Sequence, residues 1–124
     1  MRETFVARAA SADTFEDLNA FVVCLAEDQD GLGRRLELQR ALSFDEQDRR
    51  NGMDTYCLSN ESGASHYGGV KTWAVTNNVL TVDLDAVASN ALGVSGYEVE
   101  LRVPQPEVVK ISEGLRRILG DGAQ

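Results

Sequence analysis

The chain has 124 residues, of which 43% are hydrophobic and 26% are charged. These values exclude a disordered tail or a coiled coil and predict one globular domain over residues 1–124. Its 20 acidic and 12 basic residues give a net charge of −8. We therefore expect no direct binding to nucleic acid and none to an anionic membrane surface, because both carry negative charge.

The first half of the chain is predicted to be mainly strands. Apolar residues alternate weakly over residues 5–9, and residues 21–25 are apolar at every position. A fully apolar strand is typically buried on both faces, so we expect residues 21–25 to be covered on both. Alternation continues over residues 36–42, where Arg40 takes an inward position. Either that strand ends there or Arg40 reaches a carboxylate.

The middle of the chain carries weaker signals. A short helical turn is predicted for residues 45–50, and a strand follows over residues 53–58. Gly68 and Gly69 are followed by a strand-like segment at residues 70–75. A phosphate-binding glycine pair requires a helix at that point, so a bulge or sharp bend of the sheet is favoured.

A hairpin and a final strand are predicted in the second half. Residues 71–76 and 80–84 are separated by Asn77 and Asn78, which tolerate the positive φ of a tight turn. Residues 97–103 alternate between apolar and polar, as in a strand with one solvated face.

Two helices are expected. Asp85 can cap a short helix over residues 86–92, and Gly93 can end it. The second helix begins near Pro106, and its apolar residues recur at three- and four-residue steps over residues 108–119. This spacing predicts an amphipathic C-terminal helix.

These elements predict an α+β fold. We expect a curved, mainly antiparallel sheet of about six to seven strands, with the C-terminal helix packed on one face and one short helix near residues 85–92. Gly114, within the C-terminal helix, either marks close packing on the sheet or has no structural consequence. We see no targeting or membrane-spanning segment and expect a cytoplasmic protein.

Catalytic and metal-binding residues are scarce. The only histidine, His66, could serve Cys57 as a base, but no oxyanion-hole turn is visible, so a surface histidine is favoured. A zinc site needs about three suitable ligands, and no such group is found, so no cofactor or metal is expected. Cys24 and Cys57 are interpreted as reduced core residues, with a disulfide between them left open.

The acidic residues fall into two groups. No basic residue lies between Arg8 and Arg34, a segment that includes Asp28 and Asp30. The second group consists of Asp45, Glu46, Asp48 and Asp54. The calcium pattern of an EF-hand is absent after Asp30. The groups are either solvated loops or a negative surface that holds a basic protein partner.

The second acidic group is interleaved with large apolar residues. Phe44, Met53 and Tyr56 alternate with its carboxylates, a combination common at the centre of protein interfaces. The simpler interpretation places Phe44 and Met53 in the core with the acids facing water, and the residues alone favour it.

The motif order resembles the bacterial immunity protein 10 family. The segment LQRALSFDEQDRRNGMDTYCL is followed by HYGGV, an amphipathic strand and a closing helix. The resemblance extends from about residue 21 to residue 119. Its specific part consists of residues 39–40, 44–48, 52–56 and 67–69.

This resemblance implies a binding protein and not an enzyme. Members of the family are predicted antidotes in polymorphic toxin systems, and no cofactor or catalysis accompanies the motifs. We expect stoichiometric inhibition of a cognate toxin, with a basic nuclease as the type that suits the charge. The expected contact residues are Asp45, Glu46, Asp48 and Asp54, with Tyr56 as an anchor and Asp28 and Asp30 as second choices.

Two other functions remain open at this point. A small-ligand- or metal-binding regulatory domain would be stabilised thermally by its ligand. A hydrolytic enzyme would lose turnover on the substitution His66→Ala.

Overall fold

The computed structural model describes residues 1–30, 32–51 and 55–120. In chain order, its elements are β1 (Arg2–Ala7), β2 (Ala9–Phe15), the 3₁₀ turn η1 (Glu16–Leu18), β3 (Ala20–Ala26), β4 (Arg35–Ala41), α1 (Glu46–Arg50), β5 (Tyr56–Asn60), β6 (Ser65–Tyr67), β7 (Val70–Thr76), β8 (Val79–Leu84), α2 (Ala86–Leu92), β9 (Gly96–Leu101) and α3 (Gln105–Leu119). The predicted α+β class, the short helix and the C-terminal helix are confirmed.

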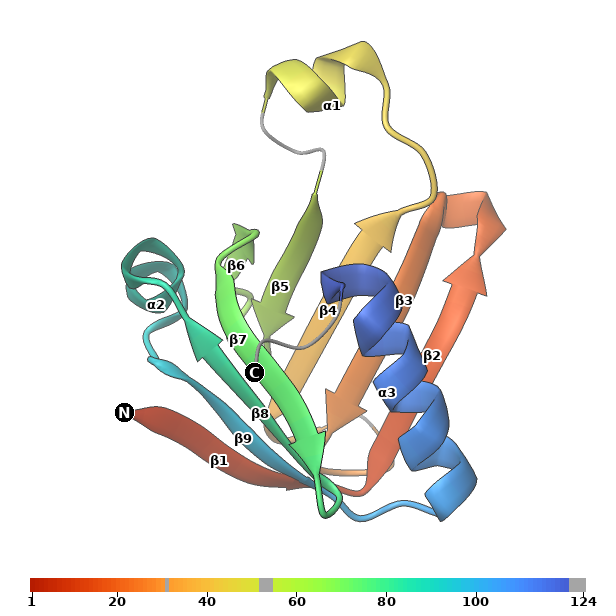
Figure 1. Cartoon of the computed structure of the whole chain (residues 1–124), viewed down its shortest axis with the longest axis vertical. Helices are drawn as coiled ribbons and strands as arrows, with labels where there is room; N and C mark the ends of the chain where they lie inside the picture. Colours follow the sequence, from red (N-terminus) through yellow and green to blue (C-terminus); the bar gives the residue numbers. More distant parts are fainter. Residues whose placement is uncertain (31, 52–54, 121–124) are drawn as a thin grey trace.

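The strands form two sheets (Figure 1). A four-stranded sheet has the order β1-β9-β8-β7, and a five-stranded sheet has the order β2-β3-β4-β5-β6. Among the described pairings only β1 and β9 run parallel. The chain crosses between sheets at Arg8 and again at Gly68 and Gly69, whose φ angles are +74° and +99°. The predicted sharp bend at the glycine pair is therefore confirmed.

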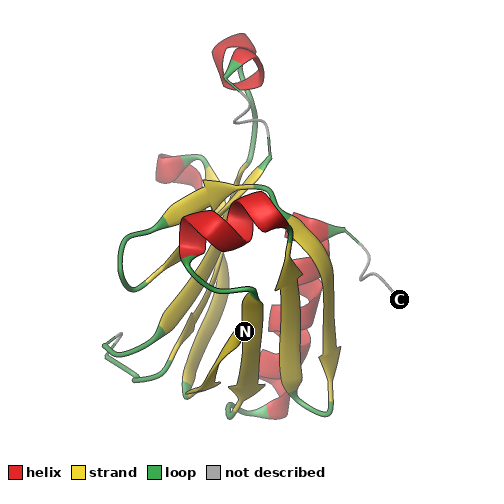
Figure 2. Cartoon of the chain, turned by 90° about the vertical axis from the view of Figure 1, so that its left-hand side faces the viewer, coloured by secondary structure: helices red, strands yellow, loops and turns green. Residues whose placement is uncertain are grey.

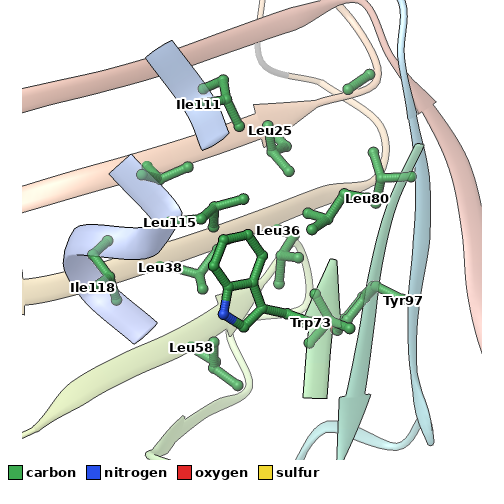
Figure 3. Close-up of a cluster of buried hydrophobic side chains, with 14 of the residues drawn as sticks. Leu25, Leu36, Leu38, Leu58, Trp73, Leu80, Tyr97, Ile111, Leu115 and Ile118 are labelled. Atoms are coloured by element: carbon green, nitrogen blue, oxygen red, sulfur yellow. The ribbon is translucent and has the colours of Figure 1, made fainter. Parts of the chain in front are cut away.

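The core lies between the two sheets and α3 (Figure 3). The five-stranded sheet is covered on one face by α3 and by the four-stranded sheet beside it. Side chains from all three layers interdigitate, and each large one contributes about 1.5–3 kcal/mol by burial. They include Leu25, Leu36, Leu38, Leu58, Trp73, Leu80, Tyr97, Ile111, Leu115 and Ile118.

Gly114 marks the closest approach of α3 to the sheet. A β-carbon at this position would lie 2.9 Å from Cγ2 of Val23, 3.1 Å from Cβ of Ala12 and 3.3 Å from Cζ of Phe21. A side chain would therefore separate α3 from β2 and β3, which explains the glycine within a helix.

The predicted caps and hairpin turn are present. The Asp85 carboxylate accepts a hydrogen bond of 2.8 Å from the backbone N–H of Ala88, and Gly93 ends α2 with a φ of +78°. Asn77 and Asn78 turn the chain between β7 and β8 with φ angles of +53° and +63°.

The expectation that β3 is covered on both faces was wrong. Val23 and Leu25 are fully buried beneath α3 and the four-stranded sheet, whereas Val22 and Cys24 point to the other face and are half-buried. Figure 2 shows α3 and the four-stranded sheet on one side of the five-stranded sheet, with no described helix over the opposite side. We call this opposite side the outer face.

Arg40 also differs from the expectation. Strand β4 continues through Arg40 to Ala41, and Nη1 of Arg40 donates to the carbonyl of Ile118, 3.4 Å away, rather than to a carboxylate. Its guanidinium lies 5.5 Å from the centre of the Phe44 ring. The carbonyls of the last helical turn have no partner within the helix and carry partial negative charge, so they suit an arginine.

The cysteines are not core residues. Both are free and half-buried, and they lie on β3 and β5 with β4 between them. Strands two places apart in a sheet are separated by about 10 Å. A disulfide needs Cα atoms within about 7 Å, so Cys24 and Cys57 form none.

Candidate functional site

The acidic residues of α1 hold the start of that helix. The Asp45 carboxylate accepts from the backbone N–H of Asp48 at 2.7 Å, and the Asp48 carboxylate accepts from the backbone N–H of Asp45 at 3.1 Å. This reciprocal pair is a capping box. Glu46 is exposed and takes no part in it. Two of the predicted contact residues therefore also have a structural role.

Tyr56 ties two strands together. Its ring is half-buried and packs against the core, and its hydroxyl accepts a hydrogen bond of 2.9 Å from the backbone N–H of Val70. Burial raises the pKa of Tyr56. Asp54, another predicted contact residue, lies outside the described residues.

Asp28 and Asp30 lie far from α1. Both are exposed, in the connection between β3 and β4, at one end of the five-stranded sheet. Helix α1 follows the other end of β4 (Figure 1). A strand of seven residues spans roughly 20 Å, which is the length of both β3 and β4. Asp28 and Asp30 therefore lie on a different surface from the acidic residues of α1.

A carboxylate cluster near Asp28 was not predicted. Burial raises the pKa of Glu3, and the neighbouring carboxylates of Glu61 and Glu27 raise it further, while Arg34 opposes them. Glu27 also accepts from the backbone N–H of Arg34 at 3.0 Å, and Glu61 accepts from that of Arg35 at 2.9 Å. Glu27 and Glu61 thus both bind the backbone at the start of β4.

A small hollow lies where α1 meets the outer face. It measures about 110 Å³ and is lined by Gln39, Ala41, Asp48, Thr55, Cys57 and Tyr67. Tyr67 lies on the edge strand β6 and is 44% exposed. The sequence motif included Tyr67 but gave no sign of its exposure, because β6 has only three residues and no readable alternation.

Two larger hollows lie along the outer side of the four-stranded sheet. They measure about 520 Å³ and 570 Å³, share Val79 and Glu100, and are open to solvent. Two of the carboxylates that line these hollows are held in ion pairs, Glu98 with Arg2 at 3.5 Å and Glu100 with Arg102. Small-molecule sites are mostly apolar and enclosing, so these hollows do not favour the small-ligand alternative.

The geometry separates His66 from Cys57. In the β5–β6 ladder, His66 is opposite Leu58, whereas Cys57 is opposite Tyr67. Successive side chains of a strand point to opposite faces, so His66 and Cys57 lie on opposite sides of the sheet. This arrangement does not suit a thiol activated by a histidine base.

Residues 1–30, 32–51 and 55–120 contain neither a group of metal-ligating side chains nor a helix suited to crossing a membrane. No group of three or more His, Cys, Asp or Glu side chains there is placed to hold a metal ion. No helix in the same ranges has the length and apolar character of a membrane span.

Comparison with known proteins gives one family. The family model described as immunity protein 10 matches residues 6–109. No curated protein and no solved structure matches the chain. Because the family model spans well over half of the 124 residues, the chain belongs to the immunity protein 10 family.

Proposed function

We propose that this protein binds a cognate toxin and neutralises it by stoichiometric protein–protein inhibition. The family match over residues 6–109 carries the proposal. The placement of His66 and Cys57 on opposite sides of the sheet supports a binding role over catalysis.

The partner is a basic protein, and a nuclease-type toxin suits this chemistry. The chain carries a net charge of −8. Complementary charge raises association rates to as much as roughly 10⁸–10⁹ M⁻¹s⁻¹ at low salt. An antidote benefits from this speed because it must bind before the toxin acts.

The contact residues lie at the α1 end of the molecule. Glu46 is exposed and free of the capping box, and Asp48 lines the hollow beside Tyr67. Asp45 and Asp54 belong to the same segment of sequence. Asp28 and Asp30 lie at the opposite end of the five-stranded sheet. They are the second candidate for the toxin contact, separate from α1.

The test removes charge from α1 but keeps its cap. Reversing the charge of Asp45 or Asp48 would also break the capping box and confuse folding with binding. Asparagine caps helices about as well as aspartate. The variant Asp45→Asn/Glu46→Gln/Asp48→Asn therefore removes three charges and leaves the hydrogen-bond acceptors in place.

Binding to the protein encoded by the neighbouring gene is measured at low and high salt. We expect the wild type to form a 1:1 complex that weakens with salt, and the α1 variant to associate roughly tenfold more slowly at low salt. The matched control is Asp28→Asn/Asp30→Asn, which we expect to bind nearly as fast as the wild type. An α1 variant that binds like the wild type would exclude α1 as the contact. A wild type that neither binds nor inhibits the toxin would contradict the function.

A further inference from the structure

The outer face carries two rows of side chains that cross the five-stranded sheet near α1. Strand register places Asp13, Val22, Gln39, Cys57 and Tyr67 side by side in one row. It places Phe15, Ala20 and Ala41 in the next. We call six of these residues, Phe15, Val22, Gln39, Ala41, Cys57 and Tyr67, the outer patch.

The outer patch is too apolar for a sheet face in water. Solvated faces of antiparallel sheets normally present polar residues. Here Phe15 and Tyr67, on the two edge strands, are 41% and 44% exposed, with Val22 and Cys57 half-buried between them. The one charged residue in the two rows, Asp13, lies 3.5 Å from Nζ of Lys110. Apart from Asp13 and the exposed amide of Gln39, the two rows present apolar or weakly polar side chains, and exposed apolar surface of this kind marks interaction sites.

We propose that the toxin docks on the outer patch and places one basic side chain in the hollow between Tyr67 and Asp48. This inference rests on the proposed function and names the surface that performs it. It also accounts for β3, whose sequence is that of a strand covered on both faces. The chain covers one face of β3, and the toxin covers the other.

The chemistry of the hollow selects a cation. At about 110 Å³, with the Asp48 carboxylate, the Gln39 amide and the Tyr67 ring in its lining, the hollow has room for the head of a single side chain. An arginine or lysine there would donate a charge-assisted hydrogen bond to the Asp48 carboxylate and make a cation–π contact with Tyr67. Phe15 and Val22 would pack against apolar residues around that cation.

A second copy of this chain does not fit the patch. The two rows contain no lysine or arginine, so a symmetric contact through them would supply no cation to either hollow. The net charge of −8 would also make the two copies repel each other.

The test compares exposed apolar residues inside and outside the patch. Tyr67→Ala and Phe15→Ala are matched by Val109→Ala on α3 and Val87→Ala on α2, whose side chains are 49% and 67% exposed. Thermal unfolding establishes that each variant is folded. Tyr67→Phe is included because it keeps the ring that packs on the cation.

Dissociation constants for the neighbouring-gene toxin are then measured. We expect Tyr67→Ala to weaken binding at least tenfold, mainly through faster dissociation, and Phe15→Ala to weaken it several-fold. We expect the dissociation constants of Tyr67→Phe and of both valine variants to stay within about twofold of the wild-type value, because these variants leave the ring at position 67 in place. Asp48→Asn should weaken binding and flatten its salt dependence, whereas Glu113→Gln, at an exposed position on α3, should do neither.

The outcomes separate the two proposals. If the wild type binds the toxin but Tyr67→Ala and Phe15→Ala bind as well as Val109→Ala, the outer patch is overturned and the proposed function stands. If the wild type neither binds nor inhibits the toxin, both are overturned. A wild-type dimer that Tyr67→Ala dissociates would assign the patch to a second copy and overturn the inference.

Discussion

Arg40 shows how a charged residue can occupy an inward position of a strand. The buried leucines Leu36 and Leu38 lie on the same side of β4. Arg40 follows them in the alternation and reaches the carbonyl of Ile118 at the end of α3. The sequence indicated that Arg40 was unusual, but its partner lies 78 residues away and could not be identified from local pattern.

Arg40→Met tests this contact. Methionine keeps an apolar stem but removes the donor and the charge, so we expect a loss of about 1 kcal/mol in the free energy of unfolding. Urea unfolding measures it. The control is Arg102→Met, which removes an exposed ion pair with Glu100 and should change stability by less than about 0.5 kcal/mol. Equal effects would contradict a specific role for Arg40.

The spacing of Asp45 and Asp48 already indicates a capping box at the sequence level. A short polar residue followed three residues later by an acid, ahead of a helix, is typical of a capping box. The helical turn was predicted, but the two carboxylates were assigned to a partner without their role at the helix start. The structure gives them that role, and partner contact by the same side chains remains a prediction.

At the scale of elements, local chemistry was a reliable guide. Helix α2 begins after Asp85 and ends at Gly93, as predicted. Asn77 and Asn78 form the predicted hairpin turn. Each of these features depends on residues within a few positions of one another. The face that an element buries is different, because it depends on what packs there. For that reason β3 was predicted as a fully covered strand and is not.

Gly114→Ala tests the packing of α3. Alanine favours a helix over glycine by about 1 kcal/mol, but its β-carbon would lie 2.9 Å from Cγ2 of Val23. Overpacking of this kind costs about 1–3 kcal/mol. Because Val23 and Phe21 are themselves buried, we expect the steric cost to prevail and the melting temperature to fall. A higher melting temperature would show that α3 can shift without loss.

At the scale of the whole molecule, three carboxylates from distant parts of the chain meet. Glu3 lies on β1, and Glu27 and Glu61 lie in connections that flank β4 and β5. Burial raises the pKa of Glu3, and the two other carboxylates add to this effect. Glu3 therefore binds a proton more tightly in the folded chain than in the unfolded chain. Its charged form opposes folding at neutral pH.

Glu3→Gln should stabilise the protein at pH 7. Because the pKa of Glu3 is raised by folding, stability is lost as the pH rises from the ordinary pKa of a glutamate in the unfolded chain through the higher pKa in the folded chain. We expect a higher melting temperature than the wild type at pH 7 and no gain at pH 3, where Glu3 is protonated in both states. Glu113→Gln, at an exposed position on α3, is the control. A gain that persists at pH 3 would contradict an ionisation effect.

Local sequence was enough to predict the α+β class, the helix caps, the hairpin turn, the bend at Gly68 and Gly69, and the family. These follow from alternation and turn chemistry within a few residues. The tertiary structure divided the strands into two sheets and placed Asp28 and Asp30 at the opposite end of the five-stranded sheet from α1. It also brought Phe15, Val22 and Tyr67 onto one face. Contacts between distant segments determine which strands pair and which faces are covered. The alternation of residues along one strand carries no information on which strand lies beside it.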